Sequence, residues 1–435
     1  MRSLLFSVVL FQTLAGLAVA DPFLGTNPAI PPNLQITTFA SGLNFPYGLY
    51  QLPDGSILAA TTTGNMFGSS VQIARITQTN GIATSSPTVV FNGSFGPATG
   101  LTGSGNIVAV STGTNTGSQI VLLQAGAGGS LTQIGQLTFA YPGVWEHDSH
   151  AIAIRAVTGQ PNTYQLVFNV GAQFNDTASV GTVGISGLAS ATLNPDSVYS
   201  MNFSVSGSTV TPTAPTQVAS GLRNAFALGF NPNGDIYIGE NGIDFNGTNV
   251  PVSADNFDIV PVGSGILNFG FPNTYIDPVT GAVIGNPAGV TLPFASFLPI
   301  AGAATQGVSG LALSPPGFPG GLNNGVFFGF YGRHAGGTAN DLTGVVYVDA
   351  TTGKYFDFLP GAQNGVGHSG SLLATSDALY IADLSTIGSD NQGGSGVIYR
   401  VGLAAVPEPS TAFLFSAGVL ALAALRRRYY LVARE

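Results

Sequence analysis

The sequence contains no cysteine and little charge. Without cysteine the chain can form no disulfide framework, no thiolate metal site and no cysteine nucleophile. Charged residues make up 7% of its 435 residues, against about 25% in an average protein, so Ser, Thr, Asn and Gly must supply its solubility. The formal net charge of −9 argues against nucleic acid and against an anionic lipid surface as partners.

The N-terminus has the three parts of a secretory signal peptide. Arg2 supplies the positive charge, residues 4–17 are almost wholly apolar, and Ala18–Ala20 form a small-x-small cleavage site. We therefore expect residues 1–20 to form a signal-peptide helix that is removed, with Asp21 as the mature N-terminus. A buried core helix is the alternative interpretation of this segment.

The C-terminus combines a Pro-Glu-Pro triplet, an uncharged apolar run over residues 411–425 and an arginine cluster. The triplet and the cluster are Pro407, Glu408, Pro409, Arg426, Arg427 and Arg428. The run is shorter than the ~20 residues that a stable membrane span needs, and the arginines should stay on the cytoplasmic side. We expect a short hydrophobic transmembrane helix here, with a lasting tail anchor as the alternative.

Residues 406–429 resemble the PEP-CTERM sorting domain of exopolysaccharide-producing Gram-negative bacteria. In that domain a Val-Pro-Glu-Pro-Ser stretch precedes a short apolar segment and a terminal arginine cluster, and each part is present here in the same order. The resemblance implies recognition and cleavage near the Pro-Glu-Pro by a membrane protease, exosortase. It implies an exported protein that passes through a transient inner-membrane anchor to the cell surface or the extracellular space.

Between the two ends, short strand-like runs predict an all-β fold. The runs are rich in Val and Ile and are bounded by Gly, Asn, Asp and Pro, and 61 glycines indicate many tight turns. A cycle of strand, turn, strand, loop and strand recurs six times, most clearly at residues 227–238. Six cycles predict a six-bladed β-propeller over residues 34–402. A pair of β-sandwiches is the alternative.

The fourth cycle carries the most specific motifs. Residues 220–234 read SGLRNAFALGFNPNG, residues 240–242 are Glu-Asn-Gly, and residues 268–272 read NFGFP. Together with GLNFPYGL at residues 42–49, these motifs resemble the soluble glucose/sorbosone dehydrogenases, which are six-bladed propellers that bind pyrroloquinoline quinone (PQQ) and calcium. The resemblance spans about residues 34–402 and implies PQQ-dependent oxidation of a sugar or a related alcohol.

The same resemblance implies roles for individual residues. His147 falls where the family carries its catalytic general base, which would take the proton of the substrate hydroxyl. Imidazole suits this role because it can accept a proton at neutral pH. Arg223 and Asn224 would contact PQQ. The backbone carbonyls of Gly242 and Ile243 would hold the calcium ion, since hard cations prefer oxygen ligands.

Each assignment has a structural alternative. His147 and His150 lie three positions apart and could share a metal ion or serve only the fold. The arginine and asparagine of the fourth cycle could instead form hydrogen bonds that close a blade. Asp255 and Asp258 are expected in a solvated turn, given the turn preference of aspartate.

Two departures from the family bear on the cofactor. Gly171-Ala172 stands where the family has a glycine–aspartate pair whose carboxylate orients the histidine, and His368 and Gly370 stand where two arginines grip the cofactor carboxylates. The competing function is a non-catalytic propeller that binds glycan or protein at the cell surface or in the exopolysaccharide matrix. A positively lined pocket would favour the enzyme, and an apolar or blocked central channel would favour the binder.

Overall fold

The computed structural model describes residues 24–66, 70–114, 117–244, 252–298, 306–332, 343–360, 368–385 and 393–404. Within these residues the protein is all-β, and its helical content is one 3-10 turn, η1 (Ala127–Gly129). The expected signal-peptide helix over 1–20 and the hydrophobic helix over 411–425 lie outside the described residues. No helix within the described ranges is long and apolar enough to cross a membrane.

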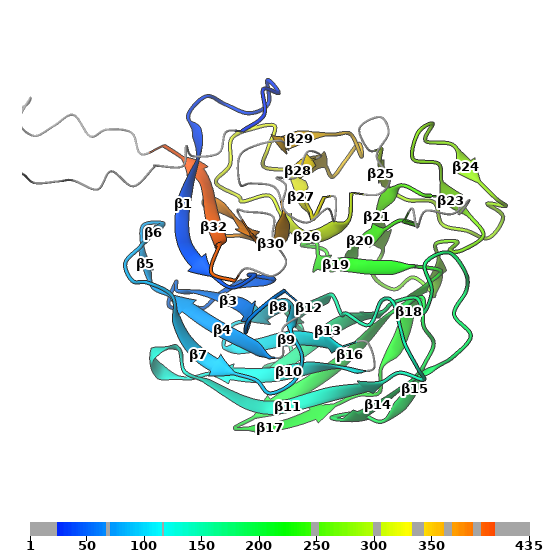
Figure 1. Cartoon of the computed structure of the whole chain (residues 1–435), viewed down its shortest axis with the longest axis horizontal. Helices are drawn as coiled ribbons and strands as arrows, with labels where there is room; N and C mark the ends of the chain where they lie inside the picture. The colour runs from blue at the N-terminus through cyan, green and yellow to red at the C-terminus, as the bar shows by residue number, and fades with distance from the viewer. Residues whose placement is uncertain are drawn as a thin grey trace, which may run out of the picture. The chain divides into compact units, whose positions relative to one another are not determined.

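Six sheets form the blades of a propeller, which confirms the prediction from the six sequence cycles (Figure 1). Each blade begins with a strand beside the central axis and continues outward. These innermost strands are β2 (Gly48–Gln51), β8 (Ala98–Ser104), β12 (Ile152–Ala156), β19 (Asn224–Phe230), β26 (Val308–Leu313) and β30 (Ser369–Ala374). Each contacts the next around the ring, and β30 contacts β2, so the ring is closed.

The remaining strands extend the blades outward. Blade 1 adds β3 (Ile57–Thr62), β4 (Val71–Ile76) and β7 (Thr88–Asn92); blade 2 adds β9 (Ile107–Thr114), β10 (Gly117–Ala125), β11 (Leu131–Ala140), β14 (Val183–Gly187) and β15 (Ala191–Leu193); blade 3 adds β13 (Thr163–Val170), β16 (Ser197–Ser206), β17 (Thr209–Pro212), β18 (Thr216–Ser220) and β22 (Leu267–Asn268). Blade 4 adds β20 (Ile236–Asn241), β21 (Asp255–Val260) and β25 (Ala295–Phe297); blade 5 adds β27 (Gly325–Phe330), β28 (Thr343–Asp349) and β29 (Tyr355–Pro360); blade 6 adds β31 (Ala378–Asp383) and β32 (Gly396–Leu403). Two short ribbons pair β5 (Gln78–Thr79) with β6 (Ile82–Ala83) and β23 (Tyr275–Ile276) with β24 (Val283–Ile284).

The sixth blade joins the two ends of the propeller. Its outermost strand, β1 (Leu34–Leu43), comes from the start of the chain and is hydrogen-bonded to β32, the last strand. In Figure 1 the dark blue β1 lies beside the orange-red β32. Backbone hydrogen bonds between the first and last strands therefore close the ring. The six sequence cycles do not predict this pairing, because it joins segments from opposite ends of the chain.

The hydrophobic core lies between neighbouring blades. The second strands β3 and β31 are buried along their whole length, because blades cover both of their faces. Between blades 4 and 5, the ring of Phe328 lies 4.9 Å from that of Phe257 and 5.2 Å from that of Phe297. Aromatic pairs of this kind stabilise a fold by about 0.5–1.5 kcal/mol each beyond the area that they bury.

The propeller has two faces, which we name after the segments they carry. The loop face carries the loops that lead into the innermost strands, such as residues 141–151 and 221–223, together with the loops that follow β13 and β20. The turn face carries the turns that join each innermost strand to the second strand of its blade, such as residues 157–162 and 231–235. Long loops on a rigid scaffold are where binding sites usually lie.

Candidate functional site on the loop face

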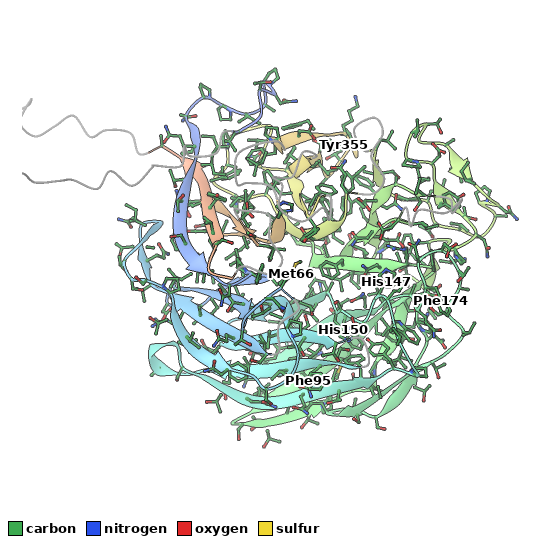
Figure 2. The ribbon with its side chains drawn as sticks, viewed as in Figure 1. Met66, Phe95, His147, His150, Phe174 and Tyr355 are labelled. Atoms are coloured by element: carbon green, nitrogen blue, oxygen red, sulfur yellow. The ribbon has the colours of Figure 1, made fainter. Side chains whose placement is uncertain are left out.

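His147 lies on the loop face, in the loop between β11 and β12 (Figure 2). Its Nδ1 lies 2.9 Å from the carbonyl oxygen of Ala172, which follows β13. A carbonyl oxygen can only accept a hydrogen bond, so Nδ1 carries the hydrogen and Nε2 keeps its lone pair. Among the described residues none bonds to Nε2, and the side chain is only half-buried. His147 therefore presents a hydrogen-bond acceptor to a ligand.

Gly171 and Ala172 fix the position of this histidine. A β-carbon at position 171 would lie 2.7 Å from both the Cβ and the carbonyl oxygen of His147, so only glycine fits there. The amide of Ala172 donates to the carbonyl of Arg223 at 2.7 Å. The indole Nε1 of Trp145 donates to the carbonyl of Gly171 at 3.1 Å. A backbone carbonyl thus orients the imidazole where the resemblance implies an aspartate.

Compared with that aspartate, the carbonyl of Ala172 keeps the orientation of the imidazole but supplies no negative charge. Burial lowers the pKa of His147 to about 3, and the nearby Arg223 cation adds to the shift, against the opposing effects of the Ala172 carbonyl and Asp244. The imidazole is therefore neutral across the physiological range. A neutral imidazole accepts a hydrogen bond well, but a pKa this low makes it a weak general base.

Arg223 is 3% exposed, and other protein groups already bind its guanidinium. Its Nε donates to the carbonyl of Asn175 at 2.8 Å, and Nη2 donates to the Asn175 Oδ1 and to Asp244, both at 2.7 Å. Its Nη1 lies 3.4 Å from the carbonyl of Asn241. These bonds join the loops of blades 3 and 4. They match the structural alternative for Arg223, in which it holds blades together.

Asn224 begins β19, where it pairs with Asn241 at the end of β20. The Oδ1 atoms of both side chains are buried and lack a hydrogen-bond donor. A buried acceptor without a donor costs about 1–3 kcal/mol. Blade 4 therefore holds two unsatisfied acceptors that are enclosed by the protein and are not exposed to a ligand on the loop face.

Gly242 and Ile243 follow β20 directly, and their backbone is held in place. The amide of Gly242 donates to Asp255 at 2.9 Å, and the amide of Ile243 donates to the Oγ of Ser253 at 2.7 Å. A β-carbon at position 242 would collide with the carbonyl oxygens of Ser253 and Ala254. The carbonyl of Ile243 accepts from the amide of Ser253 at 3.2 Å. One of the two carbonyls proposed for calcium thus already has a partner.

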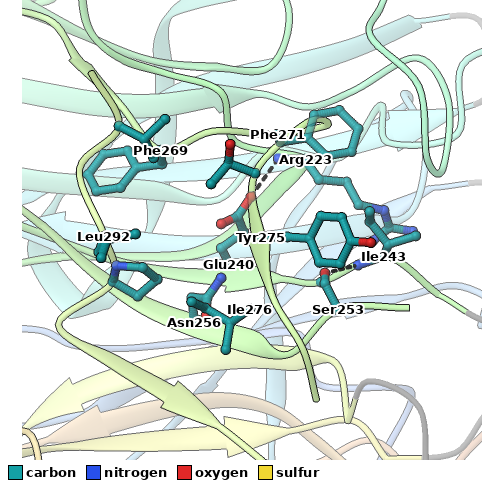
Figure 3. A pocket seen from close by; sticks show the side chains of 14 residues that line it. Arg223, Glu240, Ile243, Ser253, Asn256, Phe269, Phe271, Tyr275, Ile276 and Leu292 are labelled. Atoms are coloured by element: carbon teal, nitrogen blue, oxygen red, sulfur yellow. Dashed lines mark hydrogen bonds between the residues drawn. The ribbon is translucent and has the colours of Figure 1, made fainter. Parts of the chain in front are cut away.

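Beside these residues lies a small cavity of about 20 Å³ (Figure 3). Arg223, Glu240 and Ser253 are among its polar lining residues, and Phe269 and Tyr275 are among its apolar and aromatic walls. A volume of this size holds about one water molecule. The cavity is therefore too small for a sugar or a quinone.

His150 has a structural role. It is fully buried, with Nδ1 2.6 Å from the carbonyl of Asn169 and Nε2 2.6 Å from the Oγ of Ser118. Its ring lies 4.0 Å from that of Phe139. Both nitrogens are used, so His150 does not share a metal with His147. In the described ranges, no group of three or more His, Asp or Glu side chains could hold a metal ion.

The expected solvated turn at Asp255 and Asp258 is wrong, because both residues are buried in β21. Asp255 accepts backbone amides from Gly242, Gln306 and Gly307 at 2.7–2.9 Å, which ties blade 4 to the loop into β26. Neither carboxyl oxygen of Asp258 has a hydrogen-bond partner of normal geometry. Burial, followed by the charge of Glu240, raises its pKa well above the usual value.

Carboxylates dominate the surroundings of His147. Burial raises the pKa of Glu146, and the charges of Asp176 and Asp244 add to the shift, against the opposing effect of the Arg223 cation. Burial raises the pKa of Asp148 to about 6, and one of its oxygens has no hydrogen-bond partner. Among the described residues of the loop face, Arg223 is the one arginine or lysine. The positively lined pocket that would favour the enzyme is therefore not formed by these residues.

The central channel has both apolar and polar walls. It has a volume of about 360 Å³. Leu101, Ile152, Leu228, Leu311 and Leu372, from five of the innermost strands, are among the residues that line it.

Known proteins match this chain in two ways. Residues 405–428 match the family model described as the PEP-CTERM protein-sorting motif. The chain carries a PEP-CTERM sorting motif. A PEP-CTERM motif marks a protein for export and sorting to the cell surface, and it implies recognition by an exosortase-type protease. No curated protein matches the sequence.

The solved structures most like this propeller include PQQ-type sugar dehydrogenases. The holo PQQ domain of pyranose dehydrogenase from Coprinopsis cinerea is 14% identical, with a TM-score of 0.56 over 88% of this chain and 97% of its own. The calcium structure of a Trichoderma reesei carbohydrate-active enzyme of family AA12 is 16% identical, with a TM-score of 0.54 over 89% and 98%. The PQQ-bound aldose sugar dehydrogenase of Streptomyces coelicolor is 16% identical, with a TM-score of 0.50 over 86% and 99%. These likenesses establish the fold.

The described residues of the loop face do not fit PQQ well. PQQ is a tricarboxylate and needs cations, but Arg223 is buried and hydrogen-bonded to protein groups. His368, which stands in place of a family arginine, is buried and bonded through Nδ1 to the carbonyl of Tyr331 at 2.9 Å. The carboxylates near His147 would repel an anionic cofactor. The hydrogen-bond acceptors around His147 suit an uncharged ligand rich in hydroxyls.

Proposed function

We propose that this is an exported, surface-sorted propeller that binds a neutral sugar on its loop face. The PEP-CTERM motif supports export, and we infer that the chain passes through a transient inner-membrane anchor over residues 411–425 before cleavage near Pro407–Pro409. The signal peptide at residues 1–20 starts this route. Sorting to the surface would place the propeller where polysaccharide is present.

The observation that carries the sugar-binding proposal is the neutral, outward-facing imidazole of His147 among hydrogen-bond acceptors. A sugar hydroxyl can donate to Nε2, and another hydroxyl can donate to the exposed carboxylate of Glu146. The exposed ring of Phe174 lies one residue beyond Gln173, whose carbonyl accepts from the amide of Glu146 at 3.2 Å. An exposed aromatic ring next to polar groups offers a face for the C–H side of a sugar.

Oxidation of the bound sugar is the second candidate function, and the shared fold with PQQ-type sugar dehydrogenases favours it. In that case His147 would take the hydroxyl proton, and Arg223 and Asn224 would contact PQQ. The carbonyls of Gly242 and Ile243 would hold calcium. This candidate requires Arg223 to exchange its present hydrogen bonds for cofactor contacts.

One experiment separates the two candidates. The purified protein is titrated with a panel of neutral sugars by calorimetry, with and without PQQ and calcium, and dye reduction is followed in parallel. We expect a sugar to bind without the cofactor, His147→Ala to weaken that binding about tenfold, and no dye to be reduced. Turnover that needs PQQ would establish the second candidate instead. Absence of sugar binding under all conditions would reject both.

A further inference from the structure

The turn face carries a second open pocket, which the proposed function does not use. It lies between blades 3 and 4 and has a volume of about 800 Å³. The end of β12 and the turn after it form one wall, and the end of β19 with the turn Asn231–Gly234 forms the other. The pocket therefore lies at the opposite ends of the same strands that present His147 and Asn224 on the loop face.

Arg155, the fourth residue of β12, lines this pocket and is held ready for a ligand. Its guanidinium carbon lies 4.5 Å from the centroid of the Phe230 ring, in a cation–π contact. Its Nε donates to the Oε1 of Gln165 at 2.8 Å. These two contacts fix the plane of the guanidinium. Its two Nη groups have no hydrogen-bond partner among the described residues.

Ion pairing distinguishes Arg155 from the other arginines of the described ranges. Those arginines form the pairs Arg75–Asp54, Arg223–Asp244 and Arg400–Asp377 at 2.7–2.9 Å. Asp235, whose charge acts on Arg155, is not paired with it. Its two oxygens instead accept from the amide of Val262 and from the Nδ2 of Asn231, both at 2.8 Å. Arg155 therefore has no ion-pair contact within 4 Å among the described residues, although the charge of Asp235 still acts on it.

The most specific motif of the sequence builds the opposite wall. In the turn NPNG, the Oδ1 of Asn231 accepts the amide of Asp235 at 2.9 Å, and Gly234 has a φ of +94°. A β-carbon at position 234 would collide with the guanidinium of Arg155. Glycine is therefore favoured here for its left-handed backbone, and any side chain would also displace the guanidinium of Arg155.

We propose that this pocket binds a carboxylate-bearing sugar, such as a uronate residue of a polysaccharide. The two open Nη groups of Arg155 match the two oxygens of a carboxylate, and the fixed guanidinium plane favours that bidentate geometry. Thr158, Asn202 and Asn233, which also line the pocket, carry neutral side chains that can bond to sugar hydroxyls. Hydroxyl-binding groups around one cation point to an acidic sugar. This site does not depend on the loop-face proposal.

The test is calorimetry of the purified protein with a short galacturonate oligomer and with its methyl ester. Esterification removes the charge and keeps the sugar, so we expect the ester to bind at least about tenfold more weakly. Arg155→Gln should weaken binding of the free acid by a similar factor. Thr158→Asp adds a negative charge to the pocket while Arg155 stays in place, and it should also weaken binding of the free acid. Lys354→Gln, which removes an exposed cation elsewhere, should leave binding unchanged.

Three outcomes would overturn this proposal. Equal binding of the acid and the ester would show that the carboxylate is not recognised. Wild-type affinity in both pocket variants would place the binding elsewhere. Displacement of the oligomer by an equal concentration of inorganic sulfate would reduce the site to a general anion site. Arg155→Gln should still bind neutral sugar on the loop face, so a failure of one site can be told from a failure of the other.

Discussion

Each of the two faces of blades 3 and 4 carries an arginine, and the two arginines differ in their hydrogen-bond partners. On the loop face, Arg223 is buried and its guanidinium is shared among Asn175, Asp244 and Asn241. On the turn face, Arg155 is stacked on Phe230 and keeps two Nη groups open. An arginine whose donors are all used serves the fold, whereas one with open donors can serve recognition. The partners of a cation, more than its position in a motif, indicate its role.

The carboxylates of the two faces also differ in burial and in their partners. On the loop face Asp255 is buried and accepts three backbone amides. On the turn face Asp54 and Asp377 are solvent-exposed and pair with arginines. The loop face thus depends on Asp255 for structure, while Asp54 and Asp377 of the turn face can be exchanged at little cost.

The largest expected effect comes from Asp255→Ala. Three buried backbone amides would lose their acceptor, at about 1 kcal/mol or more each, so we expect the free energy of unfolding to fall by about 3 kcal/mol. Asp377→Ala removes an exposed carboxylate of the turn face and should change it by less than about 1 kcal/mol. Urea unfolding of both variants measures the difference. Equal effects would mean that the two faces use their carboxylates alike.

Gly171→Ala should have the next largest effect. The new β-carbon would press on the backbone and Cβ of His147, so we expect a loss of about 1–3 kcal/mol in stability and a loss of sugar binding on the loop face. Gly265→Ala is the matched control, because nothing lies within 4 Å of the position of its β-carbon. Calorimetry with a galacturonate oligomer should show unchanged binding on the turn face. Intact neutral-sugar binding in Gly171→Ala would contradict the role assigned to His147.

Asp258→Asn should stabilise the protein at alkaline pH. Burial raises the pKa of Glu240 to about 7 and that of Asp258 well above its usual value. The folded state therefore holds protons that the unfolded state releases, and stability is lost as the pH rises through the folded pKa values. An uncharged Asn removes one of the two like charges, so we expect the free energy of unfolding to rise by about 1 kcal/mol at about pH 8.

Urea unfolding at about pH 6 and about pH 8 tests this prediction. The decline in stability between the two pH values should be smaller in Asp258→Asn than in the unmodified protein. A variant that is less stable at the higher pH would show that the carboxyl group of Asp258 is stabilising there.

The smallest expected effects concern salt and pH. Because burial lowers the pKa of His147 to about 3, neutral-sugar binding should not change between about pH 5 and pH 8 in an Asp148→Asn background, which removes the neighbouring carboxyl whose pKa burial raises to about 6. Added salt should leave that binding unchanged and should weaken uronate binding at Arg155, since an exposed charge is screened. Titrations across both ranges provide the measurement. A loop-face affinity with a midpoint near pH 6.5 would mean that the imidazole of His147 is more solvated than the structure shows.

The blades could be predicted from the sequence because each is a local pattern. Short apolar runs joined by turns such as Asn231–Gly234 specify strand pairs within a few residues of each other. The pairing of β1 with β32 joins residues more than 350 positions apart, as Thr37 and Arg400 illustrate. No local pattern encodes such a contact, so the closing strand could not be found in the cycles.

The site was predictable only in part. His147 stands in a recognisable motif, but its orienting group is the backbone carbonyl of Ala172, and a backbone carbonyl leaves no mark on residue type. Asp258 resembles a turn residue by composition, although its register opposite Ile238 places it inside blade 4. Nothing in the sequence separates Arg155 from the other arginines. Its pocket exists because a turn nearly eighty residues later packs beside it.

The pairing of β1 with β32 also governs when the protein can finish folding. A chain crossing a membrane from its N-terminus delivers β1 first and β32 last, so the sixth blade cannot be completed until Leu403 has emerged. The Pro-Glu-Pro of the sorting motif begins four residues later, at Pro407. Cleavage at that point would leave every strand of the propeller in place. The anchor proposed above over residues 411–425 would then hold the chain at the membrane just as its first and last strands become able to meet.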